Sequence, residues 1–313
     1  MQLYAESSWS PGQLLKVQKK TPDYSAMLSY VGATAVQYTL VLAALHVVQI
    51  VLLKRLPAVT LPLPSLPLPF SDFSLRTPSI LFRGLKLAVP AALGLPALTL
   101  ALPAATFPAL SFPSLNAVGS ALNLSSSKNM AVFFLSLFVA LRTRIFSPLD
   151  NSRPKASSAD PVFKNRLRPW FQPPPLAFPV IWTNIAILRA ISSTIVYAVT
   201  GTLLCPAIFA LVLHLCIGDT WNTINNVERR MGTAALVVPA VLVSAAYALY
   251  RYSLVSTTAA YMLSPMVAWL TVANCLVFSI WRLNYKLAKS PSLFPSVEEG
   301  PRSPWRMPLS SSK

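Results

Sequence analysis

Acidic residues are scarce in this chain. Its 313 residues include 9 Asp and Glu against 26 Lys and Arg, which gives a net charge of +17. Between residues 24 and 149 the single acid is Asp72. The basic residues do not gather into a folded basic patch. They lie between hydrophobic segments, where they set membrane orientation and meet anionic lipid headgroups. We therefore expect membrane lipids, and no nucleic acid, among the partners of this protein.

Cysteine and histidine are too few to indicate a metal centre or a disulfide framework. Cys205, Cys216 and Cys275 lie within apolar segments without a CxxC pair, which is typical of packing residues. The two histidines are His46 and His214; a lone helical histidine is more often a packing or hydrogen-bonding residue than a haem ligand. The sequence also has no Ser/His/Asp grouping and no Gly-rich phosphate loop. These absences argue against an enzyme and against an obligatory cofactor.

Long apolar runs are what the chain has in abundance. Apolar residues make up 54% and charged residues 11% of the sequence, and the mean hydropathy is +0.55. A helix needs about 20 apolar residues to cross a bilayer. The pattern predicts an all-α, multi-pass integral membrane protein, with a bundle of five transmembrane helices and an N-terminal extension. The helices are expected at residues 129–147, 177–200, 203–222, 232–255 and 258–283.

Positive residues collect on one side of the predicted bundle, which we call the basic face. This face carries the first loop (residues 148–176), the loop around residues 228–230 and the segment after residue 282. The opposite side carries little charge beyond Lys128 and Arg251. The positive-inside rule assigns the basic face to the cytosol or its organellar equivalent.

The chain divides into three parts around this bundle. Residues 1–128 form the extension, with a candidate extra membrane helix at 26–53 and a low-complexity tract at 57–113 that carries 11 prolines. So many prolines exclude a regular spanning helix there. Residues 129–285 form the membrane domain, and residues 286–313 are expected to be a basic, disordered tail. The acid-poor extension is compatible with targeting to a plastid or mitochondrion.

Two aromatic blocks carry the functional signal. The first reads P-W-F-Q-P-P-P-L-A-F-P-V-I-W from Pro169 to Trp182. Its consecutive prolines stiffen the loop, and rings on a stiff loop keep their positions with little ordering cost when a ligand binds. The second block begins at Pro265 and places Trp269 and Ala273 one turn apart on a helix face, where the small alanine leaves room beside the indole. An interfacial aromatic belt is the simpler explanation for either block taken alone.

These blocks resemble the two signature motifs of the translocator protein/tryptophan-rich sensory protein family. The first has the family spacing at Pro169, Phe171, Pro173, Pro174, Phe178 and Trp182, with Phe171 in place of a tryptophan. The second has it at Pro265, Trp269, Ala273, Leu276, Ile280, Trp281 and Asn284, with Met266 and Val277 in place of a tyrosine and an asparagine. The third predicted helix matches the family more weakly, at Leu215 and Trp221.

The resemblance implies a membrane receptor or carrier for a flat hydrophobic ligand. The family binds porphyrins, and in some members sterols, beneath the first loop, so a tetrapyrrole of the porphyrin or haem type is the expected ligand and a sterol-like molecule the second choice. A homodimer is a further candidate partner. The candidate ligand-binding residues are Phe171, Pro173, Pro174, Phe178, Trp182, His214, Trp221, Asn225, Trp269 and Ala273. Helix–helix hydrogen bonding is an equal explanation for the polar residues of the third helix.

The resemblance also leaves open a photochemical breakdown of porphyrin at Trp182 and Trp269. An alternative of a different class is a membrane-anchored assembly protein that binds partners through its Pro-rich extension.

Two charges fall within predicted helices. Arg189 is expected to extend its side chain toward the membrane surface opposite the basic face. Asp219 is expected to pair with Lys164, Arg166 or Arg168 of the first loop.

Overall fold

Helices account for nearly all of the regular structure in the part of the chain that can be described. The computed structural model describes residues 21–56, 115–150, 166–284 and 293–296. Within these ranges no strand forms beyond an isolated bridge between Pro22 and Ser296. The long helices are α1 (Tyr24–Val48), α3 (Ser127–Arg142), α5 (Ala177–Thr200), α6 (Pro206–Asn222), α7 (Met231–Ser253) and α8 (Thr257–Asn284). The short helices are η2 (Gln49–Leu53), α2 (Leu115–Leu122), η4 (Thr143–Phe146) and η5 (Thr223–Val227).

Six helices of the described residues are long and apolar enough to cross a membrane, so the predicted count of five is corrected. The five expected helices correspond to α3, α5, α6, α7 and α8, with ends displaced by a few residues. The sixth is α1, which lies in the candidate extra helix at 26–53. Many large apolar side chains of these helices are exposed, including Leu28 and Val31 of α1, as expected for helices surrounded by lipid.

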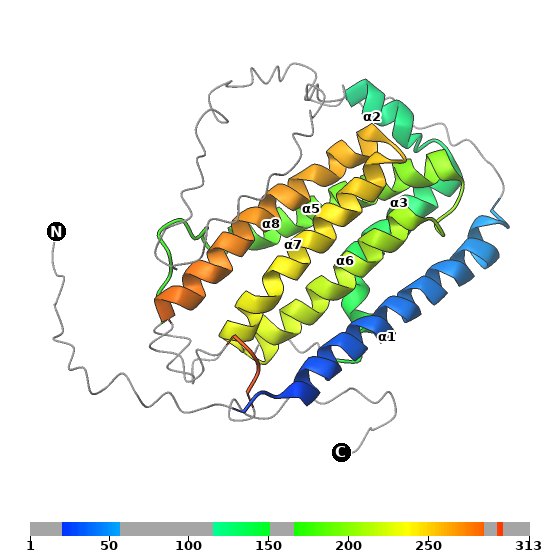
Figure 1. Cartoon of the computed structure of the whole chain (residues 1–313). Coiled ribbons are helices and arrows are strands. Elements are labelled where there is room, and N and C mark those ends of the chain that lie inside the picture. The colour runs from blue at the N-terminus through cyan, green and yellow to red at the C-terminus, as the bar shows by residue number, and fades with distance from the viewer. Residues whose placement is uncertain (1–20, 57–114, 151–165, 285–292, 297–313) are drawn as a thin grey trace, which may run out of the picture. The chain divides into compact units, whose positions relative to one another are not determined.

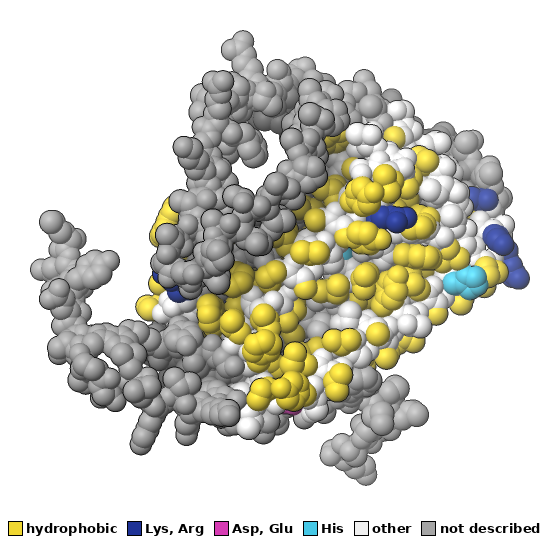
Figure 2. Space-filling view, viewed as in Figure 1, with side chains coloured by type: hydrophobic (Ala, Val, Ile, Leu, Met, Phe, Trp, Pro, Cys, Tyr) yellow, Lys and Arg dark blue, Asp and Glu magenta, His cyan; other side chains and the backbone are white. Residues whose placement is uncertain are grey.

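Neighbouring long helices pack in a fixed order. Helix α3 packs against α5, α5 against α8, α8 against α7, α7 against α6, and α6 against α1 (Figure 1). Figure 2, in the same view, shows apolar side chains over much of the face formed by α1, α6, α7 and α8. Short connections at Gly201–Cys205 and Leu254–Ser256 make α5–α6 and α7–α8 antiparallel pairs.

Helix α1 begins on the basic face. The backbone N–H of Asp23 donates to the carbonyl of Pro295 at 2.7 Å, which joins the start of α1 to the segment that follows α8. The carboxylate of Asp23 then caps the helix by accepting from the N–H of Ala26 at 3.0 Å. Since α1 crosses the bundle, Lys54 and Arg55 at its other end join Lys128 and Arg251 on the opposite side. The difference in positive charge between the two faces is therefore smaller than the one predicted for a bundle of five helices.

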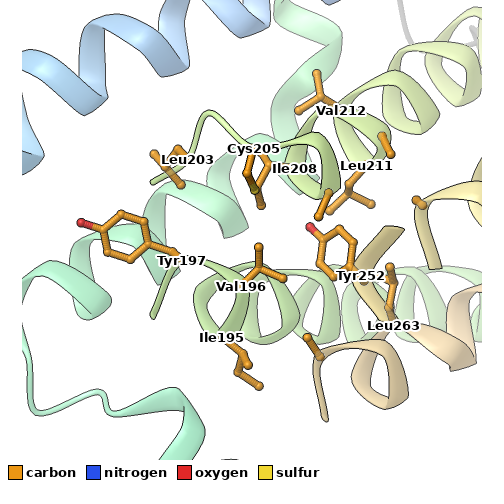
Figure 3. Close-up of a cluster of buried hydrophobic side chains, with 14 of the residues drawn as sticks. Ile195, Val196, Tyr197, Leu203, Cys205, Ile208, Leu211, Val212, Tyr252 and Leu263 are labelled. Carbon is orange, nitrogen blue, oxygen red and sulfur yellow. The ribbon is translucent and has the colours of Figure 1, made fainter. Parts of the chain in front are cut away.

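The end of the bundle opposite the basic face is a closed apolar core. Side chains from α5, α6, α7 and α8 converge there around Ile195, Ile208, Tyr252 and Leu263 (Figure 3). The Tyr252 hydroxyl, fully buried, is hydrogen-bonded to Ser193 at 2.9 Å, so its polar end is satisfied.

The sequence predictions for the tract 57–113, for the tail 286–313 and for Lys164 concern residues outside the described ranges.

Candidate ligand site between α5, α8 and the first loop

The described part of the first loop is attached to the end of α8 by Asn284. Its side-chain amide accepts from the N–H of Leu167 at 2.8 Å and donates to the carbonyl of the same residue at 2.9 Å. The amide thereby pairs with both the N–H and the C=O of one residue, in the manner of a neighbouring strand. A second donation to the carbonyl of Ile280 at 2.8 Å holds the side chain on its own helix. Asn284 thus holds the loop at the basic-face end of α8.

The prolines of the loop lead directly into α5. The Gln172 N–H donates to the carbonyl of Pro169 at 3.0 Å, and the Ala177 N–H donates to that of Pro174 at 2.9 Å. Pro173 is half-buried and Pro174 exposed, while Phe171 is half-buried with its ring against the edge of Trp170. Phe171, Pro173 and Pro174 thus belong to the proline-stiffened segment that immediately precedes α5.

Phe178 and Trp269 are brought together across α5 and α8. Their ring centroids lie 6.0 Å apart with an interplanar angle of 71°, an edge-to-face contact. The indole Nε1 of Trp269 is buried and has no hydrogen-bond partner among the described residues. Ala273 lies one turn further along α8 and is half-buried. A buried indole N–H without a partner is unusual in a folded protein, and an acceptor on a bound molecule would satisfy it.

Trp182 lies beside a buried cation. The guanidinium carbon of Arg189 is 5.9 Å from the centre of the Trp182 ring, which is within the range of a cation–π contact. The two residues are two turns apart on α5, and side chains on a helix lean toward its N-terminus, so the arginine reaches back to the indole. The Trp182 ring itself stays partly exposed, at 37%.

Arg189 corrects a sequence prediction, because its side chain does not reach the membrane surface. It is 7% exposed and points into the bundle. Its Nε donates to the sulfur of Met266 at 3.0 Å, and its Nη2 lies 3.1 Å from His214 Nε2. No carboxylate lies within salt-bridge distance of Arg189 in the described ranges. Inward orientation near polar groups is the usual solution for a charge at this depth.

The hydrogen bonds of His214 define its tautomer. Ser244 Oγ donates its proton to the carbonyl of Val241 at 2.9 Å, so it accepts from His214 Nδ1 at 3.1 Å. Nε2 is then the unprotonated nitrogen and accepts from Arg189. Both ring nitrogens are engaged, and ligation of iron by His214 would require one of these bonds to break. His214 therefore serves as a hydrogen-bond acceptor that holds the guanidinium of Arg189 in place.

Trp221 and Asn225 make other contacts. The Trp221 indole N–H donates to the carbonyl of Ala234 at 3.0 Å, which links α6 to α7. Asn225 donates to the side chain of its neighbour Asn226 at 2.9 Å. Trp221 therefore forms a hydrogen bond between two helices, which is the alternative to ligand contact stated above.

Asp219 also differs from its prediction. Its carboxylate accepts from Gln37 of α1 at 2.8 Å and interacts electrostatically with Arg144 of η4. Within the described residues Asp219 does not contact Arg166 or Arg168, and Lys164 lies outside these residues. Sequence pattern does not predict a contact between Asp219 and α1, because hydropathy says nothing about which helices pack together.

Sequence reasoning missed the roles of Arg189, Ser244 and Met266. An arginine, a histidine and a serine lie in three different apolar helices. Polar groups at membrane depth are costly unless they pair with other polar groups, so this pattern could have predicted their contact. The described residues hold no group of three metal-ligating side chains.

Comparison with known proteins places this site in a family. Residues 130–282 match the sequence model of the TspO/MBR family. The chain is 28% identical over 126 residues to the "Tryptophan-rich sensory protein" of Cereibacter sphaeroides, covering 40% of this chain and 78% of that protein. It is 29% identical over 119 residues to "Protein CrtK" of Rhodobacter capsulatus, covering 37% of this chain and 74% of that protein. Over residues 130–282, just under half of the chain, the sequence is therefore similar to the TspO/MBR family.

Proposed function

We propose that this integral membrane protein is a receptor or carrier for a flat apolar molecule bearing a carboxylate, and that a tetrapyrrole is its ligand. The observation that carries the proposal is the environment of Arg189: a buried guanidinium beside the Trp182 ring, with no carboxylate partner among the described residues. Asp219 interacts with Arg189 electrostatically but lies beyond salt-bridge distance, and a buried charge without a directly paired counter-charge is costly. A ligand carboxylate would supply that counter-charge.

The neighbouring residues suit the rest of such a ligand. Phe178 and Trp269 offer apolar ring surface, and planar aromatic molecules gain offset stacking and apolar burial against rings of this kind. The free indole N–H of Trp269 is a donor for a polar atom of the ligand. Met266, which contacts Arg189, is one turn from Trp269 on α8, so the cation of α5 meets α8 one turn away from the indole.

The test compares two ligands that differ in charge alone. Protoporphyrin IX and its dimethyl ester are titrated into the full-length protein in nanodiscs, and binding is followed by the shift of the porphyrin absorption band. Replacing Arg189→Gln should weaken binding of the free acid about ten- to hundredfold, the value of a hydrogen bond to a charged group. Binding of the ester should change little.

Arg251→Gln is the matched control, because Arg251 lies in the last turn of α7 on the opposite side of the bundle. Ester binding in the Arg189 variant reports that the bundle is still folded. Equal affinity of wild type and Arg189→Gln for the free acid would refute the role of Arg189. Absence of saturable binding of either porphyrin by the wild type would refute the tetrapyrrole.

The assembly alternative involves the Pro-rich tract 57–113, which lies outside the described residues. It predicts a partner protein that is lost when the tract is deleted while porphyrin binding persists.

A further inference from the structure

A groove with a volume of about 510 Å³ lies between α1, α6 and α7, on another part of the bundle from Phe178 and Trp182. Its floor runs from Leu213 of α6 to Ile224 of η5, and its walls are α1 between Met27 and Tyr38 and α7 between Thr233 and Ala240. The floor runs about 16 Å at 1.5 Å per residue. The volume falls within the range of roughly 300–1,000 Å³ that small-molecule sites occupy.

The groove exists because polar contacts attach α1 to one side of α6. The Tyr30 hydroxyl donates to Glu228, which is itself paired with Arg230 at 3.1 Å. Thr34 and Thr220 share a hydrogen bond of 2.7 Å, and Gln37 donates to Asp219 at 2.8 Å. These contacts, which we call the polar seam, fix α1 on α6, and the groove separates α1 from α7. Helix α1 lies outside the residues that match the family.

The groove opens sideways toward the surrounding bilayer. Val31 on the α1 wall is 70% exposed and Leu236 on the α7 wall is 37% exposed. Both walls also carry a small exposed residue, Ala35 and Ala240, which widens the space between them. In a membrane the molecules at highest concentration along such an opening are the lipids themselves, and mass action favours them as occupants.

One buried hydroxyl in the groove has no hydrogen-bond partner among the described residues. Thr233 is 2% exposed, lines the groove, and its Oγ1 makes no hydrogen bond among the described residues. The hydroxyls of Tyr30, Thr34 and Thr220 are already engaged in the polar seam. Thr233 is the third residue of α7, which starts on the basic face, so its hydroxyl lies near the membrane interface. This is the depth of the ester carbonyls of a glycerolipid, which can only accept hydrogen bonds.

We propose that this groove holds one acyl chain of a glycerolipid, with the ester carbonyl accepting from the Thr233 hydroxyl and the chain lying along α6. The site is independent of the proposed tetrapyrrole function, because it uses a different set of residues. Its lining is apolar apart from a few hydroxyl groups at the basic-face end, which matches the chemistry of a lipid chain joined to a polar head.

The test is photo-crosslinking of the full-length protein in nanodiscs with a phosphatidylcholine that carries a diazirine on one acyl chain, mapped by mass spectrometry. Crosslinks should concentrate on residues 27–38, 213–224 and 233–240. Replacing Ala240→Phe should fill the groove and abolish this concentration. Ala246→Phe, an exposed position of α7 outside the groove, should leave it unchanged. Thr233→Val, which keeps the shape and removes the donor, should reduce crosslinking about two- to tenfold.

Three results would overturn the proposal. Crosslinks spread evenly over all lipid-facing helices would mean an ordinary lipid annulus. Loss of the crosslinks on addition of protoporphyrin IX would assign the groove to the flat ligand. Protein–protein crosslinks through α1 and α7 would assign it to a second copy of the chain. Porphyrin binding is measured in a separate titration. A negative crosslinking result would therefore refute only the lipid site, and a negative titration would refute only the tetrapyrrole proposal.

Discussion

At the scale of single residues, two tryptophans of the same bundle differ in one hydrogen bond. The Trp221 indole donates to the carbonyl of Ala234, whereas the buried Trp269 indole has no partner among the described residues. Trp221→Phe should therefore lower the free energy of unfolding by about 1 kcal/mol more than Trp269→Phe does, because it alone breaks an existing bond. Trp269→Phe should instead weaken porphyrin binding. Denaturation in mild detergent and porphyrin titration of both variants measure the two effects, and equal destabilisation with equal affinity would contradict this division of roles.

At the scale of secondary-structure elements, the polar seam makes α1 a specific part of the bundle. Gln37 is fully buried and donates both to Asp219 at 2.8 Å and to the carbonyl of Thr143 at 3.0 Å, so it joins α1 to α6 and η4. Gln37→Leu should lower stability by about 1–3 kcal/mol, since it leaves a buried carboxylate without this donor. Thermal unfolding in detergent measures the loss. The control is Thr39→Val, at an exposed position of α1 whose hydroxyl bonds only within the helix. A Gln37 variant as stable as this control would show that α1 is held by apolar packing alone.

At the scale of the whole described structure, six spans place the start of α1 and the segment after α8 on one side of the membrane. The bond between Asp23 and Pro295 requires the same. In oriented vesicles, a membrane-impermeant maleimide should therefore label Tyr24→Cys and Phe294→Cys from one side and Leu254→Cys from the other. All three positions are exposed, at 69%, 51% and 61%. The wild type, whose Cys205 and Cys216 are buried and whose Cys275 lies on a spanning helix, is the background control. Labelling of Tyr24→Cys from the side of Leu254→Cys would mean that α1 does not span.

How far the sequence could predict this arrangement depends on the range of the interactions involved. Apolar length and the position of basic residues are local properties, and they predicted α3, α5, α6, α7 and α8 to within a few residues. The aromatic spacing predicted the family, and Phe178 and Trp269 do meet. For Asp219 the sequence did not predict Gln37, because Gln37 lies 182 residues away in a helix that pattern alone could not assign to the bundle; of the predicted partners, Lys164 lies outside the described residues. The direction of Arg189 was wrong for a similar reason: its acceptors come from α6 and α8.

Hydropathy and motif spacing are properties of the linear sequence, and they were enough to indicate an α-helical membrane protein with a TspO/MBR-like domain at 130–282. The packing of the helices places α1 on α6 and puts Arg189 beside Trp182 without a carboxylate at salt-bridge distance among the described residues. It also decided that Trp269, rather than Trp221, has a free indole N–H. In a bilayer core without water, each buried polar group must find its partner on another helix or remain unpaired, and that choice depends on how the helices pack.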